Sequence, residues 1–151
     1  MTSIKLSFNV PKPKNINTVF IIEDNEFDRN LLMDFFERYP KIAVKGFSNG
    51  DECLKDIVIS KSSPSLIILD YFLDSAVAHS KDGLEVLVKL KELSPASDFI
   101  MFTSIDNERI IELARKKGII GYVIKGEKSY DDLDSILRTN FSLGTSEEID
   151  L

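Results

Sequence analysis

Five short apolar segments, each followed by a segment of helical periodicity, constrain the fold of this chain more than any other feature. The apolar segments are TVFII at 18–22, IAVKGF at 42–47, SLIIL at 65–69, FIMFT at 99–103 and GYVI at 121–124. Three of them are apolar without a break at every second residue, which is typical of strands covered on both faces of a parallel sheet. The alternation predicts a doubly wound α/β fold with right-handed crossovers. Periodicity does not give the order of the strands.

Each segment between the strands carries an apolar stripe at helical spacing. In the first, Phe27, Leu31 and Phe35 recur every four residues, and Leu32 and Phe36 widen the stripe. The later stripes are Cys53, Leu54, Ile57 and Val58; Leu84, Leu87 and Val88; Ile110, Ile111 and Ala114; and Leu133, Ile136 and Leu137. Turn and cap signals separate these elements, namely Pro40, Pro64, Pro95, Gly118, Asn49-Gly50 and Asp82-Gly83. Five helices are therefore expected.

This pattern assigns one domain to residues 18–143, preceded by a leader at 1–17 and followed by an acidic tail at 144–151. The net charge of −6 argues against non-specific binding to nucleic acid or to anionic membranes, because both require clustered cationic residues. No apolar run approaches the roughly 20 residues of a membrane helix. The single cysteine, Cys53, allows no intrachain disulfide. We expect a cytoplasmic protein.

Polar side chains stand where the predicted strands end. They are Glu23 and Asp24 after 18–22, Asp70 after 65–69, Thr103 and Ser104 at the end of 99–103, and Lys125 after 121–124. Open parallel sheets bind ligands outside the carboxyl ends of their strands, so these side chains are expected to meet at one edge of the molecule.

Three carboxylates in one cleft raise one another's pKa unless a cation joins them. Mg²⁺ suits such a site because it prefers a few carboxylates, a carbonyl and several waters. A carboxylate beside Mg²⁺, a hydroxyl and an ammonium can accept a phosphoryl group, with Asp70 supplying the attacking oxygen. Taken singly, Asp24 or Thr103 would serve equally well as a helix N-cap and Lys125 as a solvated lysine. The joint order of these residues favours a metal-dependent phosphorylation site.

These residues resemble those of the receiver domain of bacterial two-component response regulators, including the single-domain chemotaxis type. The resemblance covers roughly residues 18–142, through FIIEDN, FSNGDECL, LIILDYFLD, DGLEVLVKLKE, FIMFTS and GYVIKG. It implies a flavodoxin-like, three-layer α/β/α fold with a five-stranded parallel sheet and five helices.

The resemblance also implies roles for individual residues. Asp70 matches the aspartate that takes a phosphoryl group from a histidine kinase or a phosphotransfer protein. Glu23 and Asp24 match the acidic pair that holds Mg²⁺. Phe72 matches the position whose backbone carbonyl completes the metal shell, and Asp70 is itself a metal ligand.

Three further positions match the residues that respond to the phosphoryl group. Thr103 resembles the hydroxyl residue that turns toward it, and Lys125 the lysine that pairs with it. Tyr122 falls at the aromatic switch, although an aromatic residue in a late strand can equally be simple core. Such a switch is a packing element with two states, biased by the new charge.

Two segments depart from the family pattern. YFLDSAVAHSK, between Asp70 and Asp82-Gly83, is longer than usual and is expected to place Asp74, His79 and Lys81 near the rim of the site. Gly126 stands where the family usually has proline. Glycine lifts the restraint on that peptide bond, so we expect a more mobile loop and looser coupling to the output surface.

With no DNA-binding module after residue 143, the resemblance implies that the signal passes to an unknown downstream protein by direct contact. ARKK at 114–117 and DDLD at 131–134 could pair across a homodimer, although complementing each helix's own dipole is the favoured interpretation. A monomer or weak homodimer is expected.

Two other classes of function share part of this residue pattern. A phosphatase of the haloacid dehalogenase type needs Asp-x-Asp at the nucleophile, whereas this chain has Asp70-Tyr71-Phe72. A receiver-like scaffold that binds partners without phosphorylation is the second alternative. The chain is accordingly expected to be a signalling phosphoacceptor and not an enzyme with an external substrate.

Overall fold

The computed structural model describes residues 5–7, 13–71 and 82–143, with residues 5–7 described as backbone only. Its central sheet has the order β1-β7-β6-β5-β3-β4. The five parallel strands are β3 (Thr18–Ile22), β4 (Ala43–Phe47), β5 (Leu66–Leu69), β6 (Asp98–Thr103) and β7 (Gly121–Ile124). They match the five predicted segments to within one residue at each end, and the predicted five-stranded parallel sheet is confirmed.

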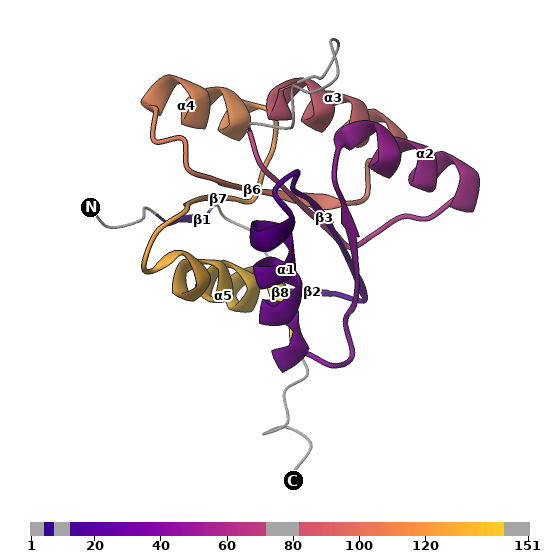
Figure 1. Cartoon of the computed structure of the whole chain (residues 1–151), viewed down its shortest axis with the longest axis horizontal. Helices are drawn as coiled ribbons and strands as arrows, with labels where there is room; N and C mark the ends of the chain where they lie inside the picture. Colours follow the sequence, from indigo (N-terminus) through magenta and orange to yellow (C-terminus); the bar gives the residue numbers. More distant parts are fainter. Residues whose placement is uncertain (1–4, 8–12, 72–81, 144–151) are drawn as a thin grey trace, which may run out of the picture.

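The helices form two layers, one on each face of the sheet (Figure 1). They are α1 (Glu26–Phe35), continued by the 3₁₀ turn Phe36–Arg38, α2 (Gly50–Ser60), α3 (Gly83–Leu93), α4 (Glu108–Lys116) and α5 (Ser129–Asn140). Helices α1 and α5 cover one face, and α2, α3 and α4 cover the other. Successive residues of one strand face opposite layers, so Val19 and Ile21 pack toward α1 and α5 while Phe20 and Ile22 pack toward α2 and α3.

Three short strands lie outside the five parallel ones, and one of them extends the central sheet. Strand β1 (Lys5–Ser7) pairs antiparallel with β7, and β2 (Lys14–Asn15) pairs with β8 (Phe141–Ser142) in a separate two-stranded sheet. The predicted leader at 1–17 thus contains two strands that pair with the rest of the chain, which its composition did not indicate. The predicted tail at 144–151 lies outside the described residues.

The predicted apolar stripe of α1 is only partly buried. Phe35 and Leu32 are buried, but Phe27 is 69% exposed and Leu31 38% exposed. Four residues advance a helix by about 40° more than one turn, so a run at every fourth residue winds away from the core. Val58 and Val88 are also exposed, because each follows a buried residue and lies about 100° further around its helix. Val86 and Leu90, which the prediction omitted, are buried.

Side-chain caps fix where the helices begin. Asn49 and Asp82 accept hydrogen bonds from the backbone N–H of Glu52 and Glu85, as the Asn49-Gly50 and Asp82-Gly83 signals indicated. Asn25 caps α1 in the same way, through the N–H of Asp28. Helix α1 therefore starts three residues beyond Glu23, directly above the carboxyl end of β3.

Candidate phosphoacceptor site

The site lies where the strand order reverses. Strand β3 pairs with β4 on one side and with β5 on the other, so the carboxyl ends of β3 and β5 are adjacent. This topological switch point is the expected ligand site of an open parallel sheet. Glu23 and Asp70 each follow one of these two strands, and both are buried, at 1% and 6% exposure.

Lys125 joins the two acids from the end of β7. Its Nζ donates to Glu23 Oε1 at 2.6 Å and to Asp70 Oδ2 at 2.9 Å. The three residues come from strands far apart in the sequence, so the predicted convergence of Glu23, Asp70 and Lys125 is what the fold produces. Lys125 also donates to Asp28 Oδ2, on the first turn of α1, at 3.2 Å.

The site around Lys125 carries more negative than positive charge. Burial raises the pKa of Glu23 to about 7; the hydrogen bond from Lys125 opposes this rise, and the nearby charge of Asp70 adds to it. Burial by itself would lower the pKa of Lys125, but its hydrogen bonds to Glu23 and Asp70 raise the pKa above its usual range. The ammonium is therefore held in its charged form by acids that it does not fully neutralise.

The donor set suits a hard divalent cation. Mg²⁺ is commonly held by one or two carboxylates together with waters, and Glu23 and Asp70 supply two. Asp24 is partly buried beside them, but the described ion pairs of Lys125 do not include it. Within the described ranges, no three acidic, histidine or cysteine side chains group closely enough to hold a metal ion by themselves. The Phe72 carbonyl and the rim residues Asp74, His79 and Lys81 lie outside the described residues.

Thr103 and Tyr122 are linked through Ile105. Both are fully buried, at 0% exposure. The backbone N–H of Ile105 donates to Thr103 Oγ1 at 3.4 Å, and Tyr122 donates its hydroxyl proton to the Ile105 carbonyl at 2.8 Å. Burial raises the pKa of Tyr122, so the phenol keeps the proton that makes this bond. One residue, Ile105, therefore contacts both side chains.

Two hydrogen bonds support the loop at Gly126. The Gly126 carbonyl accepts from Ser129 Oγ at 2.8 Å and from the Ser129 backbone N–H at 3.2 Å. No cis peptide bond occurs within the described residues. The expected mobility of this segment stays a prediction, but its carbonyl is tied to the first residue of α5.

Sequence reasoning missed two residues that shape the site, Asp28 and Gly83. Asp28 lies four residues after Asp24, on the adjoining turn of α1, and that spacing was the available signal. Gly83 allows α3 to begin directly against the site: a Cβ there would lie 2.4 Å from the Asp70 carbonyl oxygen, and the Gly83 N–H donates to the Tyr71 carbonyl at 2.6 Å. The Asp82-Gly83 pair was read only as a helix start.

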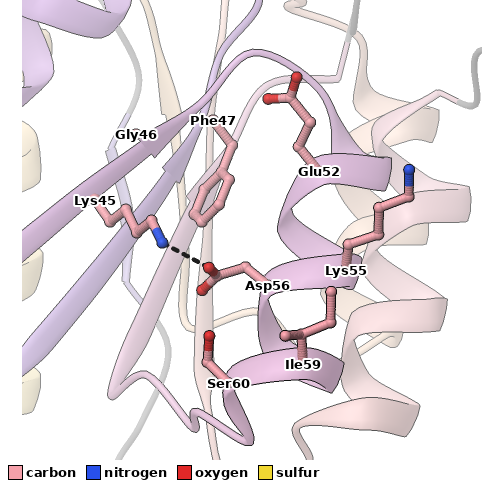
Figure 2. A pocket seen from close by; sticks show the side chains of 8 residues that line it. All are labelled: Lys45, Gly46, Phe47, Glu52, Lys55, Asp56, Ile59 and Ser60. Carbon is pink, nitrogen blue, oxygen red and sulfur yellow. Dashed lines mark hydrogen bonds and ion pairs between the residues drawn. The ribbon is translucent and has the colours of Figure 1, made fainter.

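A second concave surface lies away from these residues. An open groove of about 430 Å³ runs between the edge strand β4 and α2 (Figure 2). Its lining includes Lys45 and Phe47 of β4 and Glu52, Lys55, Asp56 and Ile59 of α2. Lys45 and Asp56 form an ion pair at 2.5 Å within it. None of the predicted site residues lines this groove, so the groove is separate from the predicted phosphoacceptor site.

The charged helix ends pair mainly within the chain. Arg115 pairs with Glu112 on its own helix, and Asp134 pairs with Arg138 and Arg38. Arg115 also lies in the last turn of α4, where a cation complements the helix dipole. The choice between helix dipole and homodimer pairing for ARKK and DDLD stays a prediction. No helix in the described part of the chain is both long and apolar enough to cross a bilayer.

Comparison with known proteins gives the same family. The sequence profile of the response regulator receiver domain matches residues 19–138. The chemotaxis protein CheY of Halobacterium salinarum is 31% identical over 118 residues, which cover 78% of this chain and 92% of CheY. The nitrate/nitrite response regulator NarL of Escherichia coli is 28% identical over 120 residues, but the match covers only 52% of its length.

Solved receiver structures share the fold. The BeF3-activated DrrB receiver domain superposes with a TM-score of 0.67 at 18% identity, covering 82% of this chain and 97% of that one. A chain of the CheX–CheY–BeF3–Mg²⁺ complex from Borrelia burgdorferi gives 0.65 at 18% identity, covering 80% of this chain and 87% of that one. With the profile match over most of its length and the acid–lysine cluster at the switch point of its sheet, the chain belongs to the response regulator receiver domains of two-component systems.

Proposed function

We propose that this chain accepts a phosphoryl group on Asp70 in a Mg²⁺-dependent reaction, from a histidine kinase or a phosphotransfer protein in the cytoplasm, and signals by contact with a downstream protein. The observation that carries the proposal is the meeting of Glu23, Asp70 and Lys125 through one ammonium. Receiver domains are signalling domains, and the membership of this chain in that family supports the proposal.

The chain's own residues can perform the transfer as follows. An oxygen of Asp70 forms a bond to phosphorus while the bond from phosphorus to the donor's leaving atom breaks, and the leaving group departs with the electron pair. Lys125 supplies a positive charge beside the receiving oxygen. Glu23 and Asp70, with Asp24 and the Phe72 carbonyl as further proposed ligands, would hold Mg²⁺, which neutralises charge on the phosphoryl oxygens when bound.

The response would pass through Thr103 and Tyr122. Thr103 turning toward the phosphoryl group would release the N–H of Ile105, whose carbonyl is held by Tyr122. That bond links the site to the packing between β7 and α4. This is how the geometry would convert a local charge into a change at the surface.

Phe27 offers an apolar contact for the phosphodonor. It is 69% exposed on the first turn of α1, next to the Asp28 carboxylate that reaches the site. An exposed aromatic ring beside a buried acidic site suits a protein donor better than a small metabolite. Phe27→Ser should slow transfer from the donor protein and leave transfer from acetyl phosphate unchanged.

The test is incubation with acetyl phosphate and Mg²⁺, followed by intact-mass measurement. A gain of one phosphoryl group that Asp70→Asn abolishes is the expected result. Beryllofluoride with Mg²⁺ should likewise shift backbone resonances near Thr103 in the wild type only. No response to either reagent would favour the scaffold alternative, and steady turnover of a small phosphate ester would favour the phosphatase.

A further inference from the structure

The Lys125 ammonium has as many carboxylate partners as it has protons. An ammonium carries three N–H donors. Its partners are Glu23 at 2.6 Å, Asp70 at 2.9 Å and Asp28 at 3.2 Å. No donor is left for a newly arrived phosphoryl oxygen, so one of the three contacts must break when Asp70 is phosphorylated.

The three partners are not equally easy to release. The Glu23 side chain is 2% exposed, so losing Lys125 would leave its carboxylate without a cation in a poorly solvated place. Asp70, 8% exposed, becomes an acyl phosphate on transfer, so its negative charge moves to the phosphoryl oxygens attached to it, which still need Lys125. The Asp28 side chain is 38% exposed and makes the longest of the three contacts. Released from Lys125, the Asp28 carboxylate can be solvated by water at little cost.

The backbone around Asp28 holds its carboxylate in place. The Asp28 N–H donates to Asn25 Oδ1 at 2.9 Å, and the Asn25 N–H donates to Glu23 Oε2 at 3.2 Å. A closed chain of contacts therefore runs from Lys125 through Glu23 and Asn25 to Asp28 and back to Lys125. The N-terminus of α1 thus fixes the backbone of Asp28 close to Lys125, so that its short side chain can reach the ammonium.

We propose that Asp28 is a positioning residue that holds one proton of the Lys125 ammonium before phosphorylation and competes for it with the phosphoryl oxygens on Asp70. This inference rests on the proposed function. While it is engaged, Asp28 also adds negative charge beside the path of an anionic donor. Asp28 therefore restrains phosphorylation by sharing the ammonium that the phosphoryl oxygens need.

The first measurement needs neither metal nor phosphodonor. In EDTA, the ¹⁵N–¹H signal of the Lys125 ammonium reports how fast its protons exchange with water. Asp28→Asn should speed this exchange several-fold because one charged acceptor is lost. Asp34→Asn is the matched control, since Asp34 is exposed on the same helix and is not a described partner of Lys125. It should leave the signal unchanged.

The second measurement is the rate of phosphorylation by acetyl phosphate with Mg²⁺. Removing one charge next to the site should raise the rate roughly three- to tenfold in Asp28→Asn, and by less than about twofold in Asp34→Asn. Equal rates and equal ammonium exchange in the two variants, with the wild type phosphorylated on Asp70, would overturn the role of Asp28 alone. A wild type that takes up no phosphoryl group would overturn the proposed function and this inference together.

Discussion

Strands β5 and β6 have a polar cluster at each end, and the two clusters are built differently. At the amino ends, Ser94 and Ser97 share a hydrogen bond at 2.6 Å, and Ser97 donates to the Pro64 carbonyl at 2.5 Å. At the carboxyl ends, Asp70 and Thr103 lie at the site that Lys125 enters. Both clusters are buried, but only the second carries charge.

The two clusters differ in how their buried polar groups are satisfied. Hydroxyl groups can donate and accept, so the serine cluster satisfies itself without ions. The carboxyl-end cluster sets three carboxylates against one ammonium, and burial raises the pKa of Glu23 to about 7. Strongly perturbed pKa values of this kind cluster at functional sites.

The largest expected effect comes from removing Lys125, the cation that pairs with the Glu23 and Asp70 carboxylates. Lys125→Met should lower the free energy of unfolding by about 4 kcal/mol at pH 8, because it leaves buried carboxylates unpaired. The loss should be smaller at pH 5, where Glu23 is protonated and no longer repels Asp70. Urea unfolding at both pH values measures it. A loss of the same size at both would mean that packing, and not charge, governs this end of the sheet.

The next effect is a dependence of stability on pH. Glu23 has a folded pKa of about 7, raised from 4.5. Because the folded state binds this proton more tightly, Glu23 adds stability below pH 4.5, and that contribution is lost as the pH rises through 7. The change is on the order of 3 kcal/mol.

Urea titrations in EDTA from pH 4.5 to 8 check this prediction. Glu23→Gln should flatten the curve over that range, since the amide does not titrate. If the wild type and Glu23→Gln lose stability in parallel, the proton is bound elsewhere.

A smaller effect is expected where helix α3 meets the charged cluster. In Gly83→Ala the added Cβ would lie 2.4 Å from the Asp70 carbonyl oxygen and 2.7 Å from Tyr71 Cα, so backbone must move. We expect a loss of about 2 kcal/mol, together with slower phosphorylation of Asp70.

Gly46→Ala is the control for the glycine substitution. Its Cβ would meet Met33 Sδ at 2.9 Å and Arg29 Cδ at 3.1 Å, both on side chains that can rotate. Thermal unfolding and acetyl phosphate labelling of both variants should separate them. Equal labelling rates would show that α3 does not set the position of Asp70.

The smallest effect belongs to the serine cluster. Ser97→Ala removes the hydrogen bonds to Ser94 and to the Pro64 carbonyl and should cost about 1 kcal/mol. No group in this cluster titrates, so the cost should be the same at pH 5 and pH 8 and with or without Mg²⁺. A cost that varied with Mg²⁺ would mean that the two ends of β5 and β6 are coupled.

The strands and the acids that follow them were predictable from the sequence. Apolar runs such as TVFII and SLIIL predicted β3 and β5, because strands covered on both faces are apolar at nearly every position. The acids that follow them were then recognisable as one site, since parallel strands place their carboxyl ends together. The burial of α1 was harder to predict, because a spacing of four residues fits a helix only over a short length, and Phe27 is exposed as a result.

The sequence by itself determined the five β-then-α units, the caps at Asn49 and Asp82, and the placing of Glu23, Asp70, Thr103 and Lys125 at strand ends, because all of these depend on local periodicity and residue chemistry. Only the tertiary structure decided that β1 pairs with β7, that Gly83 lies against the backbone of Asp70, and that Asp28 shares Lys125 with the two buried acids. Those features depend on distances between segments far apart in the chain. Such distances follow from how the layers pack, and no local pattern encodes them.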